Sequence, residues 1–112
     1  FDKMLAAIIL LVVLDYITGV LKGIYTKKLS SSTGFKGIIK KIIIFIVIAT
    51  AVCIQGLIGD SIPLREVTIM FFVCNEALSL LENAAEFIPI PEKLKEVLIQ
   101  LRDKNEGDDI NG

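Results

Sequence analysis

The sequence predicts an all-α integral membrane protein with three transmembrane helices and a C-terminal amphipathic helix. Of its 112 residues, 54% are apolar, which exceeds the usual share in soluble domains even before glycine is counted. The apolar residues gather in three blocks, as expected for membrane spans. A fourth segment follows two prolines and has the apolar period of a surface helix. The length allows one domain, residues 1–112.

The three apolar blocks predict spans at about 4–21, 42–58 and 67–88. A helix needs about 17–25 residues to cross the hydrocarbon, and the third block reaches that length only if its helix continues to Ile88. The middle block contains no charge. The outer blocks contain Asp15 and Glu76, and an Asp at the centre of a span costs about 2.5–3.5 kcal/mol. We therefore expect the outer spans to need partners that shield their polar atoms. No small-residue cleavage site follows the first block, so we expect it to be retained.

A purely basic stretch separates the first two blocks. It holds six lysines and no acid: Lys22, Lys27, Lys28, Lys36, Lys40 and Lys41. Short basic loops stay in the cytoplasm, so these lysines are expected to set the topology. The loop at 59–66 carries one arginine and two acids and should lie outside. Three spans then place the N-terminus outside and the C-terminus in the cytoplasm.

Polar residues form stripes inside the outer blocks. Their helical spacing places them on one face of each helix, and Gly19 with Gly23 would let another helix approach closely. Candidate oligomerisation or lesion-lining residues are Asp15, Thr18, Gly19, Gly23, Asn75, Glu76, Ser79, Glu82 and Asn83. Intramembrane ionisable groups usually face a bundle interior or a water-filled cavity. One interpretation is a polar seam or lesion between subunits. A second is bonding of Asp15 to Asn75 or Glu76 within one protomer, and a third is ion transport through the two acids.

Two further features complete the chain. In the middle block, Ala49, Cys53 and Gly56 form a narrow face of small residues. After the prolines, an amphipathic helix is expected at about 92–104, to lie on the membrane or pack on another chain. Its apolar stripe consists of Leu94, Val97, Leu98 and Leu101. The polar segment 105–112 is expected to be disordered.

Several function classes are disfavoured by composition. The chain has no histidine, which excludes histidine-based catalysis and histidine-ligated metals. Cys53 and Cys74 lie in apolar runs without metal-ligand spacing, and we expect both to be buried free thiols. No hydrolase or nucleotide-binding motif is present, so we expect no enzymatic activity and no cofactor. The basic stretch offers only Tyr25 and Phe35 for base stacking, which argues against nucleic-acid binding.

Three segments together resemble a known family. LDYITGVLKG (14–23), KKLSSSTGFKGIIKK (27–41) and NEALSLLENAAEFIPIPEKLKEVLIQLRDK (75–104) are similar to the phage-lysis and toxin-secretion holins of Gram-positive bacteria and their phages. The resemblance covers nearly the whole chain, but 42–65 matches only in hydrophobicity. It implies a small, multi-pass protein of the bacterial cytoplasmic membrane that forms homo-oligomers and opens lesions for an endolysin or a large toxin. It carries over no catalytic residue. Motif positions expected to serve assembly are Asp15, Tyr16, Thr18, Gly19, Gly34, Lys36, Gly37, Asn75, Glu76, Ser79, Glu82 and Asn83.

Overall fold

The computed structural model describes residues 2–111, and the side chains of residues 2–104. Its regular elements are all helical: α1 (Lys3–Tyr25), α2 (Ser31–Ile58), the short 3-10 helix η1 (Gly59–Ser61), α3 (Leu64–Ala84) and α4 (Glu92–Asn111). The all-α prediction is confirmed for this part of the chain. Long apolar runs without internal proline favour such helices.

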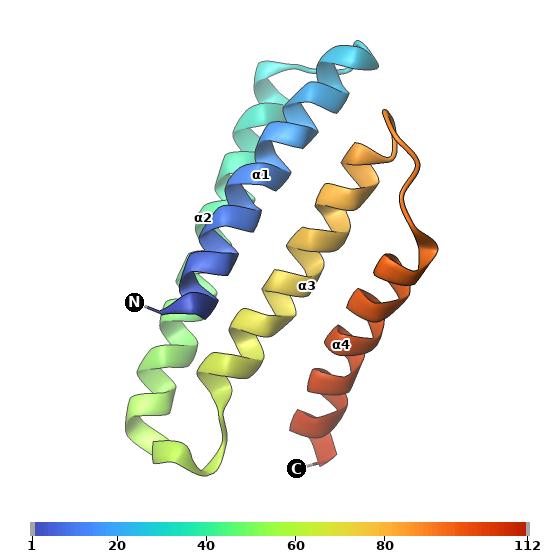
Figure 1. Cartoon of the computed structure of the whole chain (residues 1–112). Helices are drawn as coiled ribbons and strands as arrows, with labels where there is room; N and C mark the ends of the chain where they lie inside the picture. Colours follow the sequence, from blue (N-terminus) through green and yellow to red (C-terminus); the bar gives the residue numbers. More distant parts are fainter. Residues whose placement is uncertain (1, 112) are drawn as a thin grey trace.

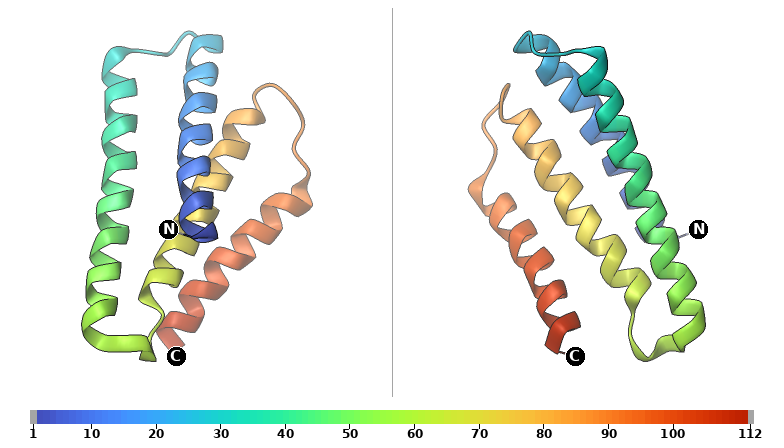
Figure 2. Two further views of the ribbon diagram at one scale, coloured as in Figure 1. Left: turned by 60° about the vertical axis from the view of Figure 1, so that its left-hand side comes forward. Right: turned by 180° about the vertical axis from the view of Figure 1, so that it is seen from behind.

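The helices run up and down in an elongated bundle (Figure 1). Helix α3 packs against α1, α2 and α4, whereas α1 and α2 touch each other only slightly. Figure 2 shows α4 on the side of α3 that faces away from α2. The 26–30 connection and the 85–91 connection therefore lie at one end of the bundle, and η1 lies at the other. Helix α3, the most polar of α1, α2 and α3, is thus the central one.

The basic stretch is mostly helix, which corrects the prediction of a loop. Ser30 caps α2, because its side chain accepts a hydrogen bond from the backbone N–H of Thr33 at 3.1 Å. Helix α2 therefore begins at Ser31 and carries Lys36, Lys40 and Lys41 on its first turns. The connection itself is tight. Lys27 takes a left-handed φ of 61°, and a Cβ on Gly23 would lie 3.1 Å from the Cβ of Leu29.

Two other expected boundaries also differ. Helix α3 ends at Ala84, four residues before the expected Ile88. Helix α4 begins at Glu92 as expected but continues to Asn111, so the backbone of 105–111 is helical where disorder was expected. The side chains of 105–112 lie outside the described residues. The apolar stripe of α4 is largely uncovered, since Leu94, Val97 and Leu101 are all exposed.

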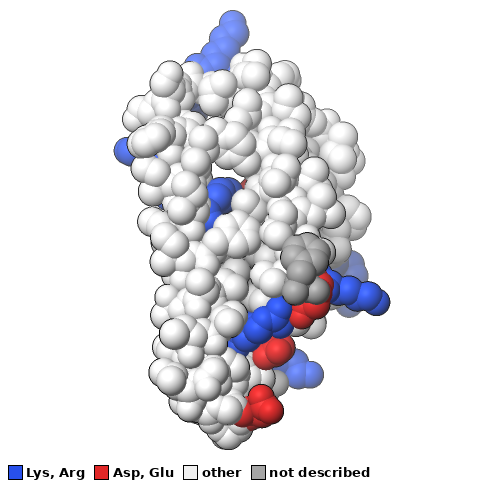
Figure 3. All heavy atoms as spheres, turned by 90° about the vertical axis from the view of Figure 1, so that its left-hand side faces the viewer, with Lys and Arg blue, Asp and Glu red and all other residues white. Residues whose placement is uncertain are grey.

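The packed core is small and the apolar surface is large. Four buried side chains, from three helices, form the core: Ile8, Val12, Ile48 and Ile69. Most of the large exposed apolar side chains belong to α1 and α2, and α3 contributes none. In Figure 3 the centre and lower left of the face are uncharged, a basic group lies at the floor of a hollow, and acidic and basic groups gather at the lower right. A soluble monomer rarely exposes so much continuous apolar surface, whereas lipid would cover it.

Helix length and composition identify two candidate membrane spans among the described residues. These are Lys3–Tyr25 and Ser31–Ser61, and only a small part of each is buried inside the bundle. Helix α3 does not meet the same criterion, so the expectation of three spans is supported for the first two only. The reason is compositional, because Arg65, Glu66, Glu76 and Glu82 are distributed along α3.

A buried ion cluster between three helices

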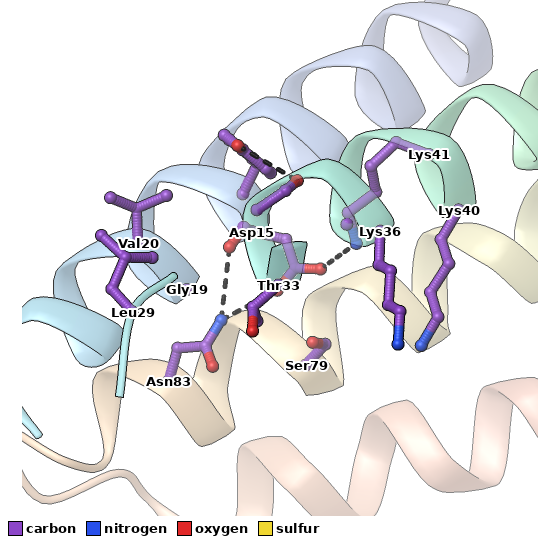
Figure 4. A pocket seen from close by; sticks show the side chains of 13 residues that line it. Asp15, Gly19, Val20, Leu29, Thr33, Lys36, Lys40, Lys41, Ser79 and Asn83 are labelled. Atoms are coloured by element: carbon purple, nitrogen blue, oxygen red, sulfur yellow. Dashed lines mark hydrogen bonds and ion pairs between the residues drawn. The ribbon is translucent and has the colours of Figure 1, made fainter. Parts of the chain in front are cut away.

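Three charged side chains from three different helices meet in the upper half of the bundle. The Lys41 Nζ of α2 lies 2.6 Å from Asp15 Oδ2 of α1 and 2.7 Å from Glu76 Oε1 of α3. Asp15 is 3% exposed and Glu76 is 6% exposed. The Lys41 side chain is 21% exposed, and its aliphatic stem reaches inward from the helix surface. Figure 4 shows Lys41 pointing at Asp15 across the gap between their helices.

Hydrogen bonds from α3 complete the coordination of Asp15. The Asn83 Nδ2 donates to Asp15 Oδ1 at 3.0 Å and lies 3.2 Å from Thr18 Oγ1. It also reaches the Asp15 backbone carbonyl at 3.3 Å. Gly19 faces this amide, and a Cβ there would lie 3.5 Å from Asn83 Nδ2, an ordinary contact distance. The D-Y-x-T-G segment of α1 and the E-N segment of α3 therefore meet directly.

The cluster contains one more carboxylate than ammonium. Both oxygens of Asp15 have partners, but the contact of Lys41 with Glu76 lacks the angle of a hydrogen bond. Among the side chains of residues 2–104, Oε1 of Glu76 is the one buried polar atom without a hydrogen bond. A buried charge is costly unless it is paired and hydrogen-bonded. The cluster therefore holds two carboxyl groups against one ammonium, and the Lys41 contact with Glu76 is an ion pair without a hydrogen bond.

This arrangement is closest to the second of the interpretations that the sequence left open, but Asp15 bonds to Lys41 and Asn83 instead of to Asn75 or Glu76. Asp15 and Glu76 are held within one protomer, and the link between them is Lys41 rather than a direct bond. Sequence reasoning assigned Lys41 to topology and missed this contact. A usable signal was present, since Lys41 is the last charge before the uncharged block and lies on the same helix.

The remaining predicted residues are divided between two places. Asn75 does not face the cluster, since its Oδ1 accepts a hydrogen bond from Arg102 of α4 at 2.9 Å. Ser79 and Glu82 line a groove between α3 and α4. Gly23 contacts its own connection at Leu29, not another helix. The polar stripe of α3 is thus covered partly by the ion cluster and partly by α4.

The motif glycines of α2 serve the contact with α1. The ring of Tyr16 lies against Gly37, where an added Cβ would be 3.4 Å from Tyr16 Cε1. The Tyr16 hydroxyl donates to the Gly34 carbonyl at 3.4 Å. These two positions bring α1 and α2 together near the ion cluster. Without side chains at Gly34 and Gly37, the ring fills the gap between the helices.

A second polar cluster, at the opposite end of the bundle, was not predicted. Arg65 of α3 lies 2.9 Å from Asp2, which caps α1 by accepting from the Leu5 backbone N–H. The Arg65 guanidinium, followed by that N–H, lowers the pKa of Asp2. Gln55 of α2 donates to the carbonyls of Gly59 and Ile62 and accepts from the Arg65 backbone N–H. These contacts fix where α3 starts relative to α1 and α2.

The two cysteines differ in environment. Cys74 is buried, as expected, but Cys53 is exposed, which corrects the prediction that both are buried. Both are free thiols. Cys53 lies on the small-residue face of α2 with Ala49 and Gly56, and nothing lies within 4 Å of a Cβ built on Gly56. The protomer leaves this face without a partner.

Comparison with known proteins gives a consistent set of relatives. Residues 1–103 match the model of the bacteriophage holin family. A Clostridium perfringens protein, described as an uncharacterized 14.9 kDa protein in the nagH 3' region, is 41% identical over 106 residues, covering 93% of this chain and 80% of the relative. An uncharacterized Listeria monocytogenes protein is 39% identical over 109 residues, covering 96% and 77%. A protein of Bacillus phage phi105 described as a probable holin is 30% identical over 105 residues, covering 93% and 78%. No solved structure matches.

The ion cluster predicts a specific stability pattern for Lys41 variants. Lys41→Met leaves two buried carboxylates facing each other, and removing one partner of a buried pair costs about 3–5 kcal/mol. We expect the lower part of that range, because Lys41 keeps some exposure. The measurement is the free energy of unfolding in detergent, followed by circular dichroism. Lys40→Met, at the exposed neighbouring position, is the matched control and should change the free energy of unfolding by less than about 0.5 kcal/mol.

A combined variant tests the cause of the loss. Adding Asp15→Asn and Glu76→Gln to Lys41→Met removes all three charges, so most of the lost stability should return. A triple variant that is no more stable than Lys41→Met would show that the lysine acts through packing rather than charge.

Proposed function

Because the chain belongs to the bacteriophage holin family, we propose that it oligomerises in the bacterial cytoplasmic membrane and opens lesions that depolarise the cell. The lesions would release an endolysin or a large toxin. The observation that carries this proposal is the Asp15–Lys41–Glu76 cluster, in which charged groups lie between apolar helices and remain incompletely neutralised.

The cluster supports a change of partners on assembly. Unsatisfied polar groups in lipid cost several kcal/mol each, so a lone protomer keeps these groups turned inward. In a dense assembly, the same groups have two further options, which are pairing with a neighbouring chain and contact with water. Because one ammonium is shared by two carboxyl groups within the protomer, either option lowers the free energy of the cluster. Assembly then depends steeply on concentration, which suits timed lysis.

We also propose that α3 crosses the membrane as a third span. Its composition alone is marginal, but a helix in a bundle is not exposed to lipid on all sides. Helix α3 packs along α1, and Lys41 and Asp15 cover its polar residues at the cluster. Three spans place the N-terminus outside and the basic end, near which α4 begins, on the cytoplasmic side.

Cysteine labelling tests this topology. Ser31 and Ser61 are exposed and lie at opposite ends of α2 and η1. In a background without Cys53 and Cys74, a membrane-impermeant thiol reagent added to intact cells should label Ser61→Cys and leave Ser31→Cys unlabelled. Both positions should react once the cells are permeabilised. Labelling of Ser31→Cys alone in intact cells would reverse the orientation.

The uncovered small-residue face of α2 is where we place a contact between subunits. Small residues let helix backbones approach closely in membranes. The face of Ala49, Cys53 and Gly56 is exposed in the protomer, whereas the comparable face of α1 is occupied by Asn83 and Leu29. A second copy of α2 fits this position without displacing any contact within the protomer.

Oxidative crosslinking tests the contact between subunits. In membranes, the Cys74→Ala variant should form a disulfide-linked dimer through Cys53 when copper phenanthroline is added. The matched control is Cys53→Ala, whose remaining Cys74 is buried and should give no dimer. A further variant, Gly56→Leu, should reduce the dimer because its side chain holds the two helices apart. Absence of a Cys53 dimer at lytic expression levels would exclude this face.

The lesion itself is tested by membrane potential in bacteria that express the chain from an inducible promoter. The wild type should depolarise the cells abruptly, at a threshold amount of protein. Asp15→Leu leaves Lys41 and Glu76 as a balanced pair, so it should accumulate in the membrane yet fail to depolarise. Asp15→Asn should depolarise the cells to an intermediate degree. At Glu76 we expect the same order, with Glu76→Gln intermediate and Glu76→Leu unable to depolarise. Asp60→Leu, in an exposed turn, is the control that should keep the wild-type schedule.

Polar contacts between membrane helices are worth about 0.6–2 kcal/mol each, so effects on assembly should be graded while effects on permeability are larger. If both leucine variants lyse on the wild-type schedule, the cluster has only a packing role. Unchanged potential at high expression of the wild type would favour a membrane scaffold, and a small graded ion current would favour a narrow channel.

A further inference from the structure

A polar pocket opens beside the ion cluster, at the basic end of the bundle. It has a volume of about 480 Å³ and lies between the end of α1, the first turns of α2 and the last turns of α3. Its polar wall includes Thr33, Lys36, Lys40 and Ser79. Val20 and Leu29 contribute an apolar side to the same pocket, so both a charged group and a hydrocarbon group find matching surfaces there.

Two lysines at this pocket have no acidic partner. Lys36 and Lys40 are one turn apart on α2, and Figure 4 shows their side chains extending in the same direction, toward α3. Neither makes an ion pair with any described side chain. Asp15, the carboxylate that lines the pocket, is engaged by Lys41. The pocket therefore presents two uncompensated positive charges.

The depth of these lysines is that of lipid headgroups. The uncharged block of α2 begins at Ile42, and a helix rises 1.5 Å per residue. Lys40 and Lys36 are thus about 3 Å and about 9 Å beyond the start of the hydrocarbon-compatible segment. The headgroup layer occupies about 5–8 Å on each side of the hydrocarbon, so the space between the two ammonium groups coincides with lipid phosphates.

We propose that this pocket binds the phosphate of an anionic phospholipid. The Lys36 and Lys40 ammonium groups contact its charged oxygens, and the hydroxyls of Thr33 and Ser79 supply neutral donors. The apolar side at Val20 and Leu29 receives the glycerol and upper acyl carbons. Basic pockets between transmembrane helices are suited to anionic headgroups. The bound lipid joins α2 to α3 at the basic end of the bundle.

Lipid retention in nanodiscs provides the test. The full chain is reconstituted with equal amounts of phosphatidylglycerol and phosphatidylcholine, extracted with mild detergent, and the lipids that remain bound are counted by mass spectrometry. The wild type should retain phosphatidylglycerol preferentially. Each lysine near an anionic surface contributes about a fivefold preference, so Lys36→Gln with Lys40→Gln should lose most of the selectivity. Both positions are exposed, and removing them leaves the ion cluster intact.

A charge-matched control separates a site from general attraction. Lys27→Gln with Lys28→Gln removes the same charge from the neighbouring connection, outside the pocket, and should keep most of the selectivity. Lys36→Arg with Lys40→Arg should also keep it and shows that the positions tolerate substitution. Equal losses in the two glutamine pairs would overturn the proposal. So would stabilisation of the detergent-solubilised protein by inorganic phosphate or glycerol 3-phosphate without any preference for phosphatidylglycerol, because the ligand would then be a soluble anion.

Discussion

The contact of Lys41 with Asp15 and Glu76 is the constraint on which the bundle depends. It is formed by one side chain from each of α1, α2 and α3, and it adds to the few contacts that α1 and α2 make with each other. Apolar packing between helices gives little orientation in lipid, because lipid tails are as apolar as the side chains. The ion cluster, with Asn83 bonded to Asp15, instead fixes the rotation of the three helices about their axes and their depth relative to one another. Lys41, the lysine nearest the uncharged block, thus links all three helices.

The central place of α3 follows from the same constraint. A helix with this many polar residues is a poor span when alone, and it fails the criterion that α1 and α2 meet. In the bundle, one polar flank faces Lys41 and Asp15, and another faces Arg102 of α4. Many large apolar side chains of α1 and α2 are exposed, whereas α3 exposes none. Two buried charges, Asp15 and Glu76, therefore lie inside a bundle whose outer surface on α1 and α2 is apolar, opposite to the order in a soluble domain.

This inverted order suits the function proposed for this member of the bacteriophage holin family. In that proposal the protein first accumulates in the membrane and later admits water, which requires polar groups that are shielded but not fully satisfied. Glu76 meets that description, since its carboxylate is buried and one oxygen has no hydrogen bond. The small-residue face of α2 and the exposed stripe of α4 remain available for neighbours. Within the protomer the buried charges are thus paired, while two of its outer surfaces remain available for contact with other subunits.

The sequence by itself determined the helical class, two of the membrane spans, the start of α4 and the family, because apolar periodicity, proline position and motif order are local properties of the chain. It also identified Asp15, Glu76 and Asn83 as polar residues in need of partners. Only the tertiary structure decided which partners they take. The position of Lys41 next to the uncharged block distinguished it from the other five lysines, but did not show that it pairs with both Asp15 and Glu76. A partner across helices depends on their relative rotation and depth, and no spacing along one chain segment encodes that.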